Sequence, residues 1–227
     1  VLQRDMRLPA AALFDMDGTL VDNMDFHARA LLEMAKRHFG VELDSDQANR
    51  DFSGMKNAEI FEILARRPIT PEEATAWETE KEELYREIYR PHLKPVRGVR
   101  ELLARLRGAG VGLAVASAAP RGNLAFVLDG LELRPLFDAV VGQDDAANGK
   151  PAPDLFLAAA SRLGVDPSAC LVFEDAVNGV LGARAAGMSA AGLATACGPE
   201  ELLAAGAAWV MPDLSSLPVD LERRLFG

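Results

Sequence analysis

Cysteine and basic residues are both scarce in this 227-residue sequence. Its two cysteines, Cys170 and Cys197, are not spaced like metal ligands, so we expect reduced thiols rather than a disulfide framework or a cysteine metal site. Lysine and arginine number 24 against 34 aspartate and glutamate residues, which gives a formal net charge of -10. Because no run of basic residues offsets this charge, a nucleic acid is not an expected partner.

Long hydrophobic runs are absent as well. No stretch approaches the roughly 18 apolar residues of a membrane span, and residues 1–9 include Arg4, Asp5 and Arg7 rather than an apolar signal segment. We therefore expect a cytoplasmic protein without a membrane partner, either a monomer or a small homo-oligomer. The length allows one large domain or a core domain that carries a smaller insertion.

Six short apolar runs have the length and composition of buried β-strands. They are residues 11–14, 111–116, 139–141, 170–173, 189–193 and 208–211. Most are separated by segments whose apolar residues recur at helical spacing, such as Leu102, Leu103 and Leu106. This alternation predicts an α/β fold, a Rossmann-like doubly wound parallel sheet with helices on both faces.

Residues 22–95 interrupt the alternation. They contain no convincing strand pattern but three successive helical patterns: one that Gly40 ends, one over about 58–66, and one from Pro71 to about residue 90. We therefore expect an all-helical cap domain over 22–95, inserted into an α/β core domain formed by 1–21 and 96–227.

Asp15 and Asp17 lie in the string FDMDGT, directly after the first predicted strand. Ligands of open parallel sheets bind at the carboxyl ends of the strands, where two carboxylates can hold a hard cation. A carboxylate there can also attack phosphorus, provided that a metal neutralises the charge it approaches. Taken alone, the string is equally compatible with a solvated Asp-Gly turn.

Three further groups follow other predicted strands. Ser117 lies in the string VASAA, where its hydroxyl and the following amides, beginning with that of Ala118, can hold phosphate oxygens, although such a serine alone is more often a helix cap. Lys150, in the string NGKPAPD, can offset phosphate charge, although such a lysine alone is more often a surface residue. Glu174 and Asp175 end a buried strand, where acidic groups are costly unless a cation or donors satisfy them.

Together these groups resemble, in order, the four motifs of the haloacid dehalogenase superfamily, and the match spans essentially the whole chain. The helical insertion after the first motif is similar to that superfamily's first cap type. The strings GKPAPD and EDAVNGV resemble its beta-phosphoglucomutase-like branch.

The resemblance implies a role for each motif residue. Asp15 would attack phosphorus, while Asp17 would protonate the leaving oxygen and then activate water. Mg2+ would be bound by Asp15, by the backbone carbonyl of Asp17 and by Asp175, with Glu174 in or next to that shell. A second carboxylate two places after the nucleophile argues against dehalogenation, which has no alkoxide to protonate.

The resemblance also indicates substrate-contacting residues in the cap. His27 lies where the phosphoglucomutase-like branch has a histidine near the acid/base. Without that resemblance, a lone histidine on a cap helix is simply a partly exposed residue with no role in the site. Lys56 and Asn57 lie in a string similar to that branch's specificity loop, but Asn57 replaces the arginine that mutases present to a second phosphate. Lys81 and Arg86 are compatible with either an anion site or a solvated helix face.

These features predict a Mg2+-dependent phosphatase that hydrolyses a small phosphorylated metabolite, such as a sugar phosphate, through an aspartyl-phosphate. A beta-phosphoglucomutase with the same nucleophile is the alternative. A third possibility is a non-catalytic binding protein on this scaffold, because a fold alone does not dictate function.

Overall fold

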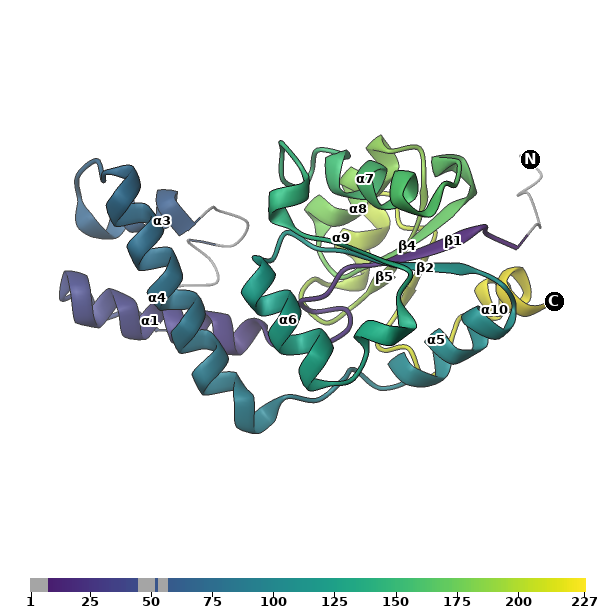
Figure 1. The fold of residues 1–227 in the computed structure, drawn as a ribbon, viewed down its shortest axis with the longest axis horizontal. Helices are drawn as coiled ribbons and strands as arrows, with labels where there is room; N and C mark the ends of the chain where they lie inside the picture. The colour runs from purple at the N-terminus through teal and green to yellow at the C-terminus, as the bar shows by residue number, and fades with distance from the viewer. Residues whose placement is uncertain (1–7, 45–51, 53–56) are drawn as a thin grey trace. The chain divides into compact units, whose positions relative to one another are not determined.

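The computed structural model describes residues 8–44, 52 and 57–227 (Figure 1). The chain divides into two compact units: Val1–Asp22 with Lys94–Gly227, here the α/β unit, and Asn23–Leu93, here the helical unit. The expected boundaries differ from these by one residue at the first junction and by two at the second. At the junctions, the Val96 amide donates to the Leu20 carbonyl at 2.9 Å, within the α/β unit.

The α/β unit contains a six-stranded, all-parallel sheet with the order β3-β2-β1-β4-β5-β6. Its strands are β1 Ala11–Phe14, β2 Gly112–Ala116, β3 Ala139–Val141, β4 Cys170–Glu174, β5 Ser189–Leu193 and β6 Trp209–Met211. The predicted doubly wound α/β class is therefore confirmed. In this order the direction of winding reverses between β1 and β4, which is the position where such sheets bind ligands.

Helices cover both faces of the sheet (Figure 1). They are α5 Val99–Gly108, α6 Arg121–Gly130, α7 Asp154–Leu163, α8 Val177–Ala185, α9 Pro199–Ala204 and α10 Val219–Phe226, with 3₁₀ turns at Arg134–Leu136, Gln143–Asp145 and Pro167–Ala169. Ala11 and Leu13 of β1 pack in one buried cluster with Phe156 of α7, Val180 of α8 and Leu202 of α9. Alternate residues of a strand face opposite sides, so every residue of β1 is buried.

The helical unit consists of α1 Met24–Phe39, α3 Asn57–Ala65, α4 Pro71–Tyr89 and a 3₁₀ turn at Arg90–His92. Gly40 ends α1 with a φ of 64°, as its sequence position predicts. Thr70 starts α4 with a reciprocal capping box to Glu73. A small apolar core that includes Leu31, Phe61 and Leu64 holds the three helices together. Of all the helices in the described ranges, none has the length and hydrophobicity needed to cross a membrane.

Candidate functional site

Three carboxylates converge at the reversal point of the sheet. Asp15 directly follows β1, Glu174 is the last residue of β4, and Asp175 comes next. The register pairs Phe14 with Phe173, their rings stack at 4.7 Å, and the Asp15 amide donates to the Phe173 carbonyl at 3.0 Å. Because the two strands are held in this register, the acidic residues that follow them are brought to the same edge.

Lys150 reaches this edge from the loop before α7. Its Nζ donates to Asp15 Oδ1 at 2.5 Å and also to Glu174 Oε1. The Lys150 side chain is only 11% exposed, and those of Asp15 and Glu174 are 8% and 1% exposed. One buried ammonium group thus bridges two buried carboxylates that lie far from it in the sequence.

The charge states of these groups follow from burial and from their neighbours. Burial raises the pKa of Asp15 to about 8; the charge of Lys150 opposes this rise, while Glu174 and Asp17 add to it. Burial, followed by Glu174 and Asp15, also raises the pKa of Asp175 well above its usual range. Burial lowers the pKa of Lys150, but Asp15 and Glu174 outweigh it, so the net shift is upward. Lys150 therefore remains protonated and positively charged beside Asp15 and Glu174.

Glu174 and Asp175 are held in different ways. Glu174 Oε2 accepts from the amides of Asp175 and Ala176, at 2.9 and 3.0 Å, so with Lys150 both of its oxygens have donors. Asp175 Oδ1 lies 3.4 Å from the Thr19 hydroxyl. Glu174 therefore orients Lys150 and the turn into α8, whereas Asp175 lies against the loop that contains Asp17.

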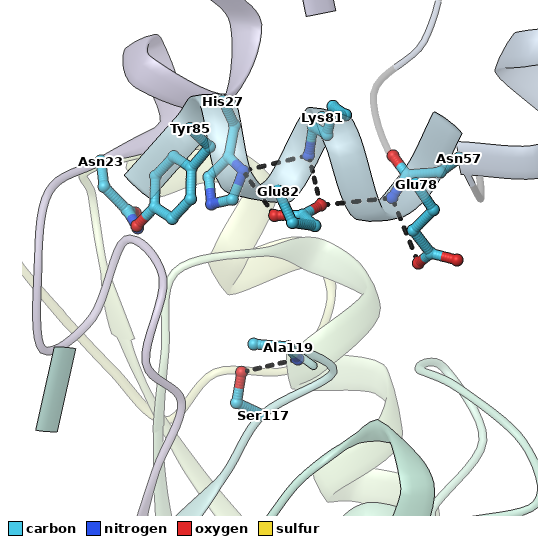
Figure 2. Close-up of polar contacts among 9 residues, drawn as sticks. All are labelled: Asn23, His27, Asn57, Glu78, Lys81, Glu82, Tyr85, Ser117 and Ala119. Carbon is cyan, nitrogen blue, oxygen red and sulfur yellow. Dashed lines mark hydrogen bonds and ion pairs between the residues drawn. The ribbon is translucent and has the colours of Figure 1, made fainter. Parts of the chain in front are cut away.

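Asp17 and Ser117 occupy the neighbouring strand ends. Asp17 is partly exposed and forms an isolated bridge with Val21. Ser117 follows β2, and its buried side chain accepts from the Ala119 amide at 3.1 Å (Figure 2). Ala118, the residue between them, is exposed. The loop after β2 is thus a tight turn closed by the Ser117 hydroxyl, next along the sheet from β1.

The donor chemistry of this edge fits a Mg2+ ion. Across the described residues, no three histidine, cysteine, aspartate or glutamate side chains form a ready-made metal cage. Mg2+ does not need one, because it keeps several waters and is usually held by one or two carboxylates together with substrate phosphate. Asp15 and Asp175 supply two buried carboxylates, and burial raises the pKa of each although Lys150 opposes the rise.

The helical unit contains a second buried polar cluster, formed by α1 and α4 (Figure 2). Lys81 Nζ lies 3.1 Å from His27 Nδ1 and donates to Glu82 Oε1 at 2.7 Å. The His27 ring stacks on the Tyr85 ring at 3.7 Å, and the Tyr85 hydroxyl accepts from Asn23 Nδ2 at 2.6 Å. Since an ammonium group can only donate, the proton of a neutral His27 is expected on Nε2.

Asn57, at the start of α3, joins this cluster. Its Nδ2 lies 3.4 Å from Glu78 Oε1 and 3.3 Å from Glu82 Oε1. Lys56 lies outside the described residues. Of the two readings open for Lys81, the solvated helix face is wrong, because its side chain is 9% exposed and bonded inside the unit. Arg86 is only partly exposed.

Sequence reasoning did not assign a role to two residues that support the site, Thr195 and Gly179. Thr195, two residues after β5, donates from Oγ1 to the Gly18 carbonyl at 2.5 Å. A Cβ on Gly179 of α8 would lie 1.9 Å from the Glu174 carboxyl group. A hydroxyl residue just beyond a strand end was the available signal for Thr195. Gly179 lies within the string EDAVNGV, but the string does not reveal its contact with the Glu174 carboxyl group.

The chain is similar in sequence and in fold to proteins that are already known. A family model described as a haloacid dehalogenase-like hydrolase matches residues 9–187. Fructose-1-phosphate phosphatase YqaB of Escherichia coli (strain K12) is 38% identical over 184 residues, which cover 80% of this chain and 94% of the relative. A crystal structure of a HAD hydrolase, family IA, variant 3, from Entamoeba histolytica HM-1:IMSS superposes with a TM-score of 0.87 at 31% identity, covering 95% of this chain and 97% of that chain. A putative beta-phosphoglucomutase from Thermotoga maritima does so with a TM-score of 0.71 at 30% identity, covering 88% and 93%.

Proposed function

Since the chain belongs to the haloacid dehalogenase-like hydrolase family, in its beta-phosphoglucomutase-like branch, we propose that it is a Mg2+-dependent phosphatase. Its substrate is a sugar phosphate or a similar small phosphomonoester. The observation that carries the proposal is the meeting of Asp15, Lys150, Glu174 and Asp175 at one edge of the sheet. The similarity to a fructose-1-phosphate phosphatase supports a sugar phosphate as the substrate class.

In the proposed reaction, an Asp15 carboxylate oxygen attacks the phosphorus. The bond from phosphorus to the ester oxygen breaks as Asp17 gives its proton to that oxygen, which leaves the alcohol and an aspartyl-phosphate. Asp17 then takes a proton from the water that attacks this phosphorus, so that phosphate leaves and the Asp15 carboxylate is restored. The two halves balance: one water enters, and one alcohol and one phosphate leave.

The other residues supply charge and position. Lys150 offsets negative charge on Asp15 and on the phosphate, and Ser117 with the Ala118 amide holds phosphate oxygens. Asp15, Asp175 and the Asp17 carbonyl would hold Mg2+, with Glu174 beside them. When bound, Mg2+ would neutralise phosphate charge, and it would also keep Asp15 ionised at pH values below the pKa of about 8 to which burial raises this group.

The helical unit is proposed to act as the cap that selects the substrate, through His27, Lys56 and Asn57. Asn57 is uncharged, and both acceptors of its amide are glutamates. A second phosphate would meet these acidic groups, so the arrangement favours hydrolysis of a monophosphate. The mutase alternative keeps support from the similarity to a putative beta-phosphoglucomutase.

An Asp15→Asn variant tests the proposal. We expect phosphate release from p-nitrophenyl phosphate to need Mg2+ and to fall by roughly 10³-fold or more in the variant, as when other covalent nucleophiles are removed. Asp220→Asn is a matched control, because the Asp220 side chain is 78% exposed on α10, and it should keep full activity. Asp15→Asn with near-parental turnover would contradict covalent catalysis.

Product analysis separates the two activities. The protein is incubated with beta-glucose 1-phosphate and a catalytic amount of glucose 1,6-bisphosphate, and both free phosphate and glucose 6-phosphate are measured. Hydrolysis predicts phosphate release that tracks substrate loss. Glucose 6-phosphate formed without net phosphate release would identify a mutase instead.

A further inference from the structure

Thr195 connects two loops of the α/β unit that are not neighbours in the sheet. It lies two residues after β5, and its hydroxyl donates to the Gly18 carbonyl at 2.5 Å, across a sequence separation of 177. The preceding amide, of Ala194, donates to the Met211 carbonyl at 2.9 Å, so the loop is also fixed to β6. Because β4 lies between β1 and β5, this hydrogen bond spans the carboxyl end of β4, where Asp175 follows.

The Asp175 carboxylate packs directly against Gly18. The φ of Gly18 is +79°, and a Cβ there would lie 1.9 Å from Asp175 Oδ2. The bare α-carbon thus permits direct contact with the carboxylate. The Gly18 amide donates to the Val21 carbonyl at 2.7 Å. Val21 on one side and Thr195 on the other therefore fix both polar groups of Gly18.

Thr19 contacts the same carboxylate. It follows the peptide whose carbonyl Thr195 holds, and its hydroxyl lies 3.4 Å from Asp175 Oδ1. That peptide joins the Gly18 α-carbon to the residue that carries the Thr19 hydroxyl, so its rotation, which changes ψ of Gly18 and φ of Thr19, would change how these two groups are placed relative to each other. One oxygen of Asp175 contacts the first of these groups and the other oxygen contacts the second.

We infer that Thr195 is a positioning residue for Asp175: its hydroxyl fixes the Gly18 carbonyl, and through it the two groups that orient the Asp175 carboxylate toward Mg2+. The inference rests on the proposed function for the identity of the ion. Thr195 acts through Gly18, and no contact between Thr195 and the reacting atoms is required. Groups that orient a metal ligand typically change metal affinity or activity by about 10- to 100-fold when removed.

The test compares Thr195→Val, which keeps the shape but loses the donor, with Thr195→Ser, which keeps the hydroxyl. Thr79→Val is the matched control, because the exposed Thr79 hydroxyl makes a similar bond, to the Thr75 carbonyl at 2.7 Å on α4. Mg2+ binding is measured by isothermal titration calorimetry without substrate, together with urea unfolding of the metal-free protein and p-nitrophenyl phosphate turnover.

We expect Thr195→Val to weaken Mg2+ binding roughly 10-fold, while Thr195→Ser and Thr79→Val stay within about 3-fold of the parent. Thr195→Val that is less stable but binds Mg2+ as tightly as the parent would overturn the inference, as would Thr195→Ser as defective as Thr195→Val. A parent that binds no Mg2+ also overturns it. A parent that binds Mg2+ but hydrolyses no phosphomonoester removes the proposed function alone, and the calorimetric comparison still decides the role of Thr195.

Discussion

The two buried polar clusters of this chain each contain a lysine that contacts a glutamate, yet they are assembled in different ways. In the α/β unit, Lys150 meets Asp15 and Glu174 across sequence separations of 135 and 24. In the helical unit, Lys81 meets its sequence neighbour Glu82. The first cluster requires β1, β4 and the loop before α7 to be brought together, whereas the Lys81–Glu82 contact of the second lies within one helix.

The clusters also differ in charge balance. Lys150 lies beside Asp15 and Glu174, with Asp175 close by, so acidic groups outnumber the cation. Burial, with a smaller contribution from the neighbouring carboxylates, raises the pKa values of Asp15 and Asp175. Lys81 contacts the Glu82 carboxylate and His27, and Glu78 joins this cluster through Asn57. The surplus of carboxylates around Lys150 agrees with the Mg2+ binding proposed for Asp15 and Asp175.

Among the changes that test this comparison of the two clusters, Gly179→Ala in α8 has the largest expected effect. The added Cβ would lie 1.9 Å from the Glu174 carboxyl group, so Glu174 must move and Lys150 loses one of its two acceptors. Displacement of this order can cost about 100-fold in turnover, measured as kcat on p-nitrophenyl phosphate. Gly108→Ala, at the last residue of α5, is the matched control: its Cβ would have no heavy atom within 4 Å, so activity should persist. Equal activity of the two variants would show that Glu174 does not position Lys150.

A smaller effect is expected from pH on the metal-free protein. Asp15 has a pKa of about 8 in the folded state against an ordinary value of 3.8, so between these pH values the folded state binds more protons than the unfolded state. The free energy of unfolding should therefore fall as pH rises from about 4 to 8. Thermal unfolding in EDTA at pH 5, 6.5 and 8 should show a falling Tm in the parent.

Two comparisons control this measurement. Asp15→Asn should have a flatter Tm profile, because the titrating carboxyl group is gone. Mg2+ added at pH 8 should raise the Tm of the parent, since it binds only the folded state. A parent whose Tm falls no more steeply than that of Asp15→Asn would contradict the raised pKa of Asp15.

The smallest effect belongs to the helical cluster. Tyr85→Phe keeps the ring that stacks on His27 but removes the hydroxyl that accepts from Asn23 Nδ2 at 2.6 Å. We expect a loss of about 1 kcal/mol in the free energy of unfolding, measured in urea. A double-mutant cycle with Asn23→Ala isolates the bond, and strict additivity of the two losses would mean that the bond contributes nothing.

The elements and the motif positions could be predicted from sequence because their signals are local. Apolar runs identified all six strands, and Asp15 with Glu174 and Asp175 appeared as charges directly after such runs. The burial of Lys81 could not be predicted, because its helix is rich in glutamate and its charges match a solvated face equally well. The contacts of Thr195 with Gly18 and of Gly179 with Glu174 could not be predicted, because they depend on distances between segments that only the folded sheet brings together.

The hydrogen bond from the Val96 amide to the Leu20 carbonyl has an evolutionary consequence. It joins the chain on either side of Asn23–Leu93, so the α/β unit already holds together the two ends from which this segment departs and returns. The entropic cost of a closed loop grows only with the logarithm of its length. Insertions of other lengths and sequences can therefore be exchanged at this junction at little thermodynamic cost. Under the role proposed for the helical unit, such exchanges would alter substrate selection without altering Asp15 and its neighbours.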